Sequence, residues 1–205
     1  MTNNDMRLAI KRYDLINLII KKYDYKSYLE IGTRNPDDCF DKIYCEAKHG
    51  VDPHPEVPCK YIMTSDDFFK KNNLKYDCIF IDGMHDYEYV DRDICNAKKC
   101  LTKNGTIIIH DCNPPTKEQQ VKFCERGSRW YGSVWRAWVK ALSNRGWYGY
   151  TVDTDCGIGI FKRGKNQYKK LDIITYEDFS ENRKEALNLI SVEDFLEKLQ
   201  NEKIQ

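Results

Sequence analysis

The stretch YDCIFIDGMHDY, residues 76–87, decides the fold. Its apolar run at 78–81 is continuous rather than alternating, which is typical of a strand buried on both faces of a parallel sheet. Apolar residues then recur at three- and four-residue spacing, which predicts a helix over 87–101. A second buried strand, 105–110, ends in the sequence HDCNPP. Two successive units therefore bring titratable side chains to the carboxyl edge of one sheet, where α/β proteins bind ligands.

Strands and helices alternate on both sides of this stretch. We therefore expect an α/β fold with a Rossmann-like, doubly wound, mostly parallel sheet and helices on both faces. Upstream, the predicted elements are an amphipathic helix at 5–23 with Leu8, Leu15, Leu18 and Ile19 on one side and Asp5 as its N-cap, strands at 27–31, 48–52 and 60–63, and a helix from Thr64 to about Lys71.

Downstream, Lys103-Asn104-Gly105 is expected to form the tight turn before the strand at 105–110. An irregular loop at 113–130 precedes a helix at 132–144. Strands at 149–152 and 157–161 predict a hairpin, and so an antiparallel edge on the sheet. Two helices are expected near 180–190 and at 191–200. We expect residues 1–170, with an N-terminal helix at 1–24, to form one domain that the charged residues 171–205 extend.

Composition limits the function classes. The chain has 33 Lys and Arg against 32 Asp and Glu, so charge gives no case for nucleic acid or an anionic membrane as partner. No apolar run reaches the roughly 20 residues of a membrane span, and the charged first 20 residues do not resemble a signal peptide. The nine cysteines include no Cys-x-x-Cys pair, so we expect reduced thiols, no structural zinc and a cytoplasmic protein.

The first and second predicted strands end in candidate ligand-binding residues. Gly32 allows a ligand to approach the backbone, although the Gly-x-Gly-x-x-Gly dinucleotide pattern is absent. Asp52 follows Gly32 by 20 residues, where an acid commonly binds a ribose. Glu30 lies between apolar residues and needs a partner such as an amino group. The alternatives are a plain turn for Gly32 and for Asp52, and a helix N-cap for Asp66.

Four motifs together resemble one family. YLEIGT at 28–33, GVDP at 50–53, IDGMH at 81–85 and GTIIIHD at 105–111 are similar to motifs of the class I S-adenosylmethionine (SAM)-dependent methyltransferases. The likeness covers about residues 25–162 and is strongest to a small bacterial group akin to sugar and antibiotic O-methyltransferases. It implies cofactor contacts from Glu30, Gly32, Thr33, Asp52, Asp66 and Asp82, with Asp66 at the adenine edge.

The resemblance also implies catalytic residues. Asp82 and Asp111, with His110 or Asn113, match the positions that hold Mg²⁺ in metal-dependent relatives, and carboxylate oxygens suit that ion. Met84 stands where sugar-modifying relatives often have a second acid, and a thioether cannot replace it. His85 is the expected general base, assisted by Asp82 and Asp111, because its pKa lies near neutrality.

Residues after the long loop could meet the acceptor. The candidates are the aromatic residues Trp130, Tyr131, Trp135 and Trp138, for which a hydrophobic helix face is the alternative, and Arg126, Arg129 and Arg136, for which solvated charge is the alternative. The sequence predicts O-methylation of a hydroxyl on a small-molecule or glycan-linked acceptor, as in carbohydrate biosynthesis. The rivals are an NAD-dependent oxidoreductase and an inactive binding module that uses residues 171–205. The oligomeric state stays open, with a homodimer as one option.

Overall fold

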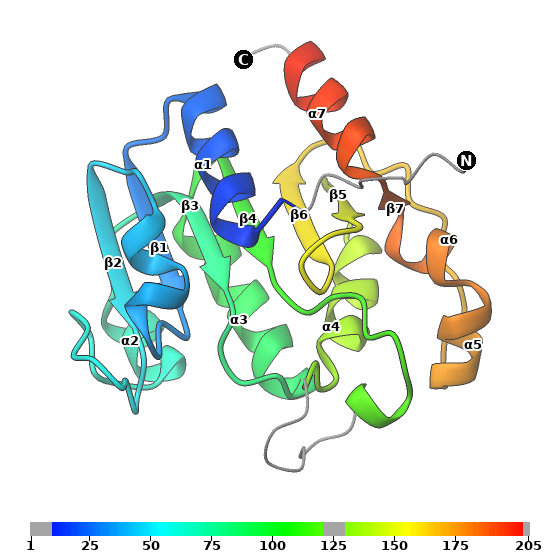
Figure 1. The fold of residues 1–205 in the computed structure, drawn as a ribbon, viewed down its shortest axis with the longest axis horizontal. Coiled ribbons are helices and arrows are strands. Elements are labelled where there is room, and N and C mark those ends of the chain that lie inside the picture. Colours follow the sequence, from blue (N-terminus) through cyan, green and yellow to red (C-terminus); the bar gives the residue numbers. More distant parts are fainter. Residues whose placement is uncertain (1–9, 121–129, 203–205) are drawn as a thin grey trace, which may run out of the picture.

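One sheet organises the computed structural model, which describes residues 10–120 and 130–202. Within those residues, seven strands follow the order β2-β1-β3-β4-β6-β5-β7 (Figure 1). β1, β2, β3 and β4 are parallel, β6 is antiparallel to β4 and β5, and β7 is parallel to β5. The predicted Rossmann-like sheet with its antiparallel hairpin is confirmed. The strands are β1 Ser27–Ile31, β2 Ala47–Val51, β3 Tyr76–Ile81, β4 Leu101–Ile109, β5 Trp147–Val152, β6 Ile158–Arg163 and β7 Leu189–Ile190.

Helices cover both faces of the sheet. Because side chains alternate along a strand, Ile79 and Ile107 pack toward α3 and α4, whereas Phe80 and Ile108 pack toward α1 and α7. The helices are α1 Arg12–Tyr23, α2 Ser65–Lys71, α3 Tyr87–Cys100, α4 Val134–Leu142, α5 Tyr176–Glu181, α6 Arg183–Leu187 and α7 Val192–Asn201, with short 3-10 turns at Pro36–Asp38, Phe40–Lys42 and Glu118–Gln120. No helix in the described residues has the length and apolar character needed to span a bilayer.

Three local predictions are wrong. Residues 60–63 form no strand, because only Tyr61 bridges to Val51. The expected turn at 103–105 lies inside β4, and the ladder with β3 absorbs the irregularity by a register shift after Tyr76. The first helix starts at Arg12, where the Asp14 carboxylate accepts a hydrogen bond from the backbone N–H of Lys11. The expected N-cap, Asp5, lies outside the described residues.

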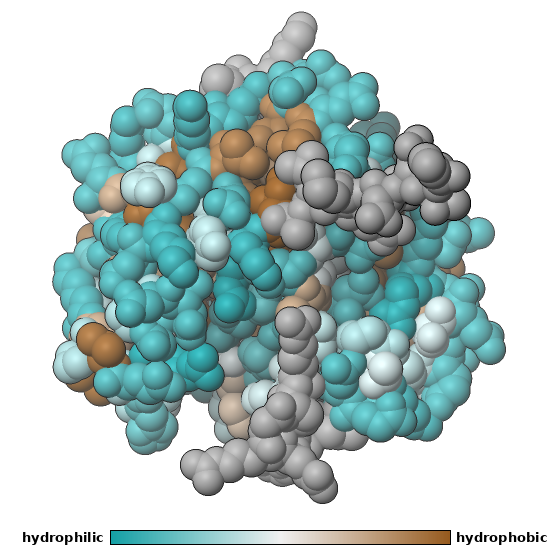
Figure 2. Space-filling model, viewed as in Figure 1, coloured by the Kyte–Doolittle hydropathy of each residue, from teal (hydrophilic) through white to brown (hydrophobic). Residues whose placement is uncertain are grey.

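The C-terminal elements complete the core. Phe179, Leu187 and Phe195 are buried, and the Phe179 ring stacks on Trp135 at 4.4 Å between centroids. The short β7 covers the outer side of β5, so the hairpin is not the last pair of the sheet. The face seen in Figure 2 is largely hydrophilic, and its largest hydrophobic patch lies between α1 and α7.

Candidate functional site

The carboxyl ends of β1 to β4 surround a cavity of about 580 Å³. The cavity lies at the edge of the sheet where the parallel strands end, which is where the ligand site was predicted. All the residues predicted to bind the cofactor, hold the metal or act in catalysis line it, except Asp66 and the alternative metal ligand Asn113. The lining includes Arg12, Glu30, Gly32, Thr33, Asp52, Thr64, Ser65, Asp82, Met84, His85, Asp93, His110, Asp111 and Trp130.

Gly32 allows two strand ends to meet closely. Its φ is +89°, and a Cβ there would lie 2.2 Å from the backbone oxygen of Asp82. Any other residue would therefore separate the end of β1 from the loop after β3. This close approach shapes the floor of the cavity.

Asp52 is held in place by the backbone. Its carboxylate accepts hydrogen bonds from the N–H groups of Arg34 at 2.9 Å and His54 at 2.7 Å. Each oxygen keeps capacity for a further donor. Beside it, the buried Thr33 hydroxyl has no hydrogen-bond partner among the described residues, which is uncommon in a folded protein. This part of the wall can bind ligand hydroxyl groups.

Glu30 is a buried carboxyl group on the α1 side of the sheet, 2% exposed. It accepts a hydrogen bond from the Tyr28 hydroxyl. Burial raises its pKa to about 8, against the opposing effect of Tyr28. A cationic ligand group would stabilise its charged form.

Asp66 lies away from the cavity, because its carboxylate pairs with Arg92 at 3.1 Å. It is not the N-cap either: the Thr64 hydroxyl caps α2 by accepting from the N–H of Asp67. Thr64 and Ser65 line this end of the cavity together with Asp93, whose pKa burial raises to about 7. No sequence signal identifies Asp93, because it lies inside a helix pattern.

Five charged or titratable side chains form one cluster at the ends of β3 and β4. The His85 Nε2 atom lies 3.4 Å from Asp82 and 3.2 Å from Asp111, and His110 Nδ1 lies 3.2 Å from each of the same carboxylates. The fifth member, Arg12, contributes Nη1, 3.3 Å from Asp82 and 3.0 and 3.1 Å from the two His110 ring nitrogens. We call these residues the charge cluster.

The cluster members shift one another's protonation. Burial alone would raise the pKa of Asp82, but His110 and His85 lower it well below its usual range. Burial would lower the pKa of both histidines, but the carboxylates raise it, most strongly for His110. The two carboxylates therefore favour the protonated form of both histidines, and Arg12 adds a fixed positive charge to the cluster.

Arg12 reaches the site from the first turn of α1. Its backbone N–H donates to Asp155 at 2.8 Å, and the Thr154 hydroxyl donates to the carbonyl of Ile10 at 2.7 Å. The turn between β5 and β6 thus fixes the start of α1 over the cavity. No sequence signal identifies Arg12, because it is one of several basic residues on a polar helix face.

The segment at 130–133 orients His85. The His85 ring stacks on Trp130 at 4.8 Å, and its Nδ1 lies 3.0 Å from the Trp130 carbonyl. Ser133 N–H donates to the His85 carbonyl at 2.7 Å. Gly132 is needed here, because its φ is +56° and a Cβ would lie 1.9 Å from the same carbonyl oxygen. In neutral His85 the proton is expected on Nδ1, which leaves Nε2 as the basic atom.

The remaining candidates lie elsewhere. Trp135 and Trp138 are core residues, and Tyr131 is buried. Arg136 is exposed, with its guanidinium 5.2 Å from the Trp135 ring centroid. Arg126 and Arg129 fall outside the described residues.

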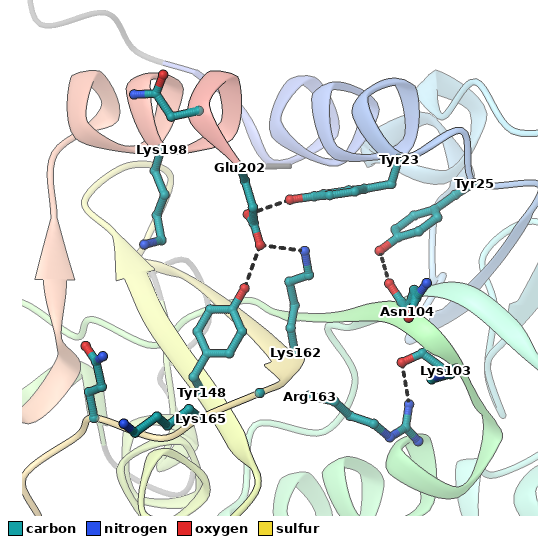
Figure 3. A pocket seen from close by; sticks show the side chains of 14 residues that line it. Tyr23, Tyr25, Lys103, Asn104, Tyr148, Lys162, Arg163, Lys165, Lys198 and Glu202 are labelled. Carbon is teal, nitrogen blue, oxygen red and sulfur yellow. Dashed lines mark hydrogen bonds and ion pairs between the residues drawn. The ribbon is translucent and has the colours of Figure 1, made fainter. Parts of the chain in front are cut away.

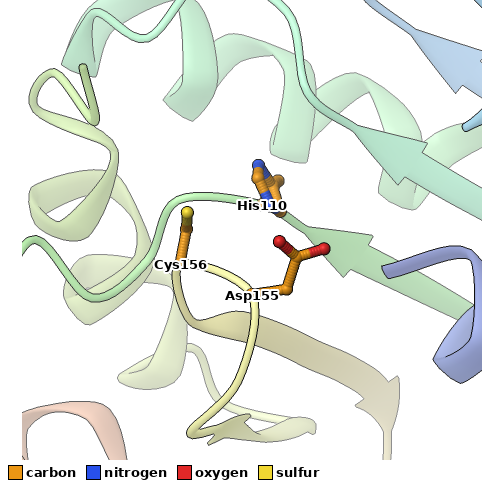
Figure 4. Close-up of side chains that lie close together, drawn as sticks. All are labelled: His110, Asp155 and Cys156. Atoms are coloured by element: carbon orange, nitrogen blue, oxygen red, sulfur yellow. The ribbon is translucent and has the colours of Figure 1, made fainter. Parts of the chain in front are cut away.

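The expected Mg²⁺ site was Asp82, His110 and Asp111, and their ligand atoms do lie within 4.8 Å of one another. The arrangement does not fit the ion, because Arg12 contacts Asp82 and His110 and because His85 contacts both carboxylates. Met84 adds no oxygen ligand. A second group, His110, Asp155 and Cys156, shares His110 (Figure 4). It fits a metal no better, because burial raises the pKa of the Cys156 thiol and Asp155 already accepts from Arg12.

Comparison with known proteins gives one family match and several fold likenesses. Residues 29–112 match the family model of a methyltransferase domain. No curated protein that was compared matches the sequence. The fold is similar to three solved structures. They are a Bacillus cereus O-methyltransferase in complex with SAH (12% identity, TM-score 0.53, covering 76% of this chain and 82% of that one), a Staphylococcus aureus putative caffeoyl-CoA O-methyltransferase (18%, 0.53, 76% and 85%), and a Klebsiella pneumoniae putative O-methyltransferase (12%, 0.55, 78% and 83%). These likenesses confirm the predicted fold, and the matched segment contains three of the four motifs quoted from the sequence in whole and the fourth in large part.

Proposed function

We propose that this chain, whose residues 29–112 match the methyltransferase-domain family, transfers a methyl group from SAM to a hydroxyl group of an acceptor. The observation that carries the proposal is the cavity in which Glu30, Gly32 and Asp52 face the charge cluster. Glu30 would bind the amino group of SAM, and Asp52 the ribose hydroxyls. Thr64 and Ser65, rather than Asp66, would lie nearest the adenine.

SAM supplies a methyl group already activated on a sulfonium sulfur. The chain must then hold the acceptor in line and remove its proton. His85 Nε2 is the proposed base, once the ring has lost the extra proton that Asp82 and Asp111 stabilise. A cation bound nearby disfavours protonated His85, so ligand binding and release of that proton favour one another. Asp82 and Asp111 would hold the acceptor hydroxyl beside Nε2.

The preferred acceptor is a sugar or another small molecule that carries several hydroxyl groups. The acceptor side of the cavity supports this choice, because Asp82, Asp111 and His110 offer polar atoms. We route no step through Mg²⁺, since Arg12 already contacts two of the three expected ligands.

The rival functions have less support. The dinucleotide glycines are absent, which disfavours an NAD enzyme. A binding module that uses residues 171–205 would need that segment exposed, yet Phe179 and Phe195 are buried in the core.

The first test is isothermal titration calorimetry with SAM and S-adenosylhomocysteine, with NADH as the control. We expect micromolar binding of the first two and none of NADH. Turnover of SAM should then be screened against free sugars and glycosides. Failure of both SAM and S-adenosylhomocysteine to bind would refute the proposal.

A further inference from the structure

A second cavity of about 680 Å³ lies at the opposite edge of the sheet, where the parallel strands begin. It is formed by the starts of β4 and β5, the end of β6, the end of α7 and the connection from α1 to β1. Its position separates it from the charge cluster by the length of the strands. The methyl-transfer proposal does not use it.

The cavity concentrates positive charge. Five cationic side chains line it, and Glu202 is the only acidic residue among those that do (Figure 3): the cations are Lys103, Lys162, Arg163, Lys165 and Lys198. The chain as a whole carries a formal charge of only +1. Acidic residues gather instead around the first cavity, including Glu30, Asp38, Asp52, Asp82, Asp93 and Asp111. The cations of the second cavity thus outnumber its one carboxylate, whereas acidic and basic side chains are mixed around the first cavity.

Glu202 cannot neutralise the five cations, because its own bonding is taken up locally. It accepts from the hydroxyl groups of Tyr23 at 2.5 Å and Tyr148 at 2.7 Å and pairs with Lys162 at 3.1 Å. Burial alone would raise the pKa of Glu202, but these donors lower it, so it stays ionised at neutral pH. Figure 3 shows the three donors pointing at it from three different elements.

The other cations have no acidic partner among the described residues. Arg163 donates only to backbone carbonyls, those of Lys98, Thr102 and Lys103. Lys103, Lys165 and Lys198 are exposed at the rim, and none forms an ion pair with a described carboxylate. Lys162 is held over the Tyr23 ring at 3.7 Å and is mostly buried. Three exposed lysines thus border a concave surface whose single carboxylate already pairs with Lys162.

We propose that this second cavity binds a multiply charged, phosphate-bearing small molecule. Phosphate oxygens accept charge-assisted hydrogen bonds from lysine and arginine, and a diphosphate can engage several of them at once. The site is distinct from the SAM cavity, and the inference does not depend on the proposed activity.

The test is calorimetric titration of the full chain with inorganic pyrophosphate, alongside orthophosphate and citrate. We expect saturable pyrophosphate binding that weakens as salt is added, since exposed cations are screened. The double variant K103E/K165E should bind pyrophosphate at least about tenfold more weakly, because two of the rim donors become repulsive. K71E/K170E is the matched control, with the same change of net charge at exposed lysines that do not line the cavity.

The control variant should bind like the parent chain, and both variants should keep the parental melting temperature within a few degrees. No saturable pyrophosphate binding would refute the proposal. Equal losses in the two variants would also refute it, because net charge rather than this cavity would then explain the affinity. Citrate that binds as tightly as pyrophosphate would overturn the assignment to phosphate.

Discussion

Replacing Glu30 by glutamine should stabilise the protein at alkaline pH. The carboxyl group has an ordinary pKa of 4.5 when the chain is unfolded and a pKa of about 8 when it is buried in the native state. Between these two values the folded chain binds the proton that the unfolded chain releases. Stability is therefore lost as pH rises through this window.

The size of the effect follows from the pKa difference. The difference between a pKa of 4.5 and a pKa of about 8 corresponds to a loss of about 5 kcal/mol in the free energy of unfolding of the parent chain. This loss is complete above about pH 8 and absent near pH 4.5. Glutamine cannot ionise, so Glu30→Gln should match the parent chain in acid and exceed its stability by several kcal/mol at about pH 9. Glu197→Gln, at an exposed position of α7, controls for the loss of one carboxylate.

Urea denaturation followed by tryptophan fluorescence at several pH values measures this difference. A stability gap between Glu30→Gln and the parent chain that stays constant with pH would refute the reasoning, and so would a parent chain that gains relative stability in alkali. Binding of S-adenosylhomocysteine supplies a second readout. Its affinity for the parent chain should rise as pH passes about 8, because ionised Glu30 pairs with the ligand amino group, and this rise should be absent from Glu30→Gln.

Three further predictions concern the cavity. His85→Gln should lower turnover by about 10² to 10⁴-fold, while its affinity for S-adenosylhomocysteine stays within about threefold of the parent value. Turnover of the parent chain should rise from neutral toward alkaline pH, because Asp82 and Asp111 raise the pKa of His85. A pH-rate profile that is flat in this range would contradict the assignment of His85 as the base. Chelation of divalent metal should change parental turnover by less than about twofold, and a metal-dependent parent chain would show that the charge cluster does not exclude the ion. Mg²⁺ should raise the melting temperature of the double variant Arg12→Ala/His85→Gln but not of the parent chain, because only that variant loses the Arg12 and His85 contacts to the carboxylates. Gly32→Ala should abolish S-adenosylhomocysteine binding and lower the free energy of unfolding in urea by at least about 1–3 kcal/mol. The control Gly146→Ala changes a glycine of similar φ that has open space around it, so it should affect stability alone. Equal ligand binding by the two variants would show that the close approach at Gly32 is unimportant.

The sequence predicted most of the sheet because the buried strands 78–81 and 105–110 are continuously apolar. The turn expected at 103–105 was wrong, since Lys103 and Asn104 are exposed residues that a strand tolerates when the neighbouring ladder shifts register. The strand at 60–63 was wrong because one bridge to Val51 is all the pairing that forms. The two-residue strand β7 is too short to produce any periodicity.

The sequence predicted those site residues that lie at the carboxyl ends of strands. Glu30, Gly32, Asp52, Asp82 and Asp111 each lie within two residues of a strand end, so topology alone brings them together. Arg12 and Asp93 lie on helices, and nothing local distinguishes them from solvated charges. Asp66 looked equivalent to a ligand contact, but its position on α2 points it to Arg92.

The contact between the start of α1 and the turn after β5 has a consequence for biosynthesis. Arg12 and Asp155 are separated by 143 positions in the chain, so the hydrogen bond that fixes the start of α1 closes a long loop. Contacts of such high sequence separation form slowly, and a chain emerging from the ribosome cannot make this one before residue 155 is released. Interrupted translation products that end before β5 would contain β1 to β4 and every cofactor-side residue, yet lack the contact that holds Arg12 over the cavity. During translation, the residues proposed to bind the cofactor can therefore come together before the charge cluster is complete.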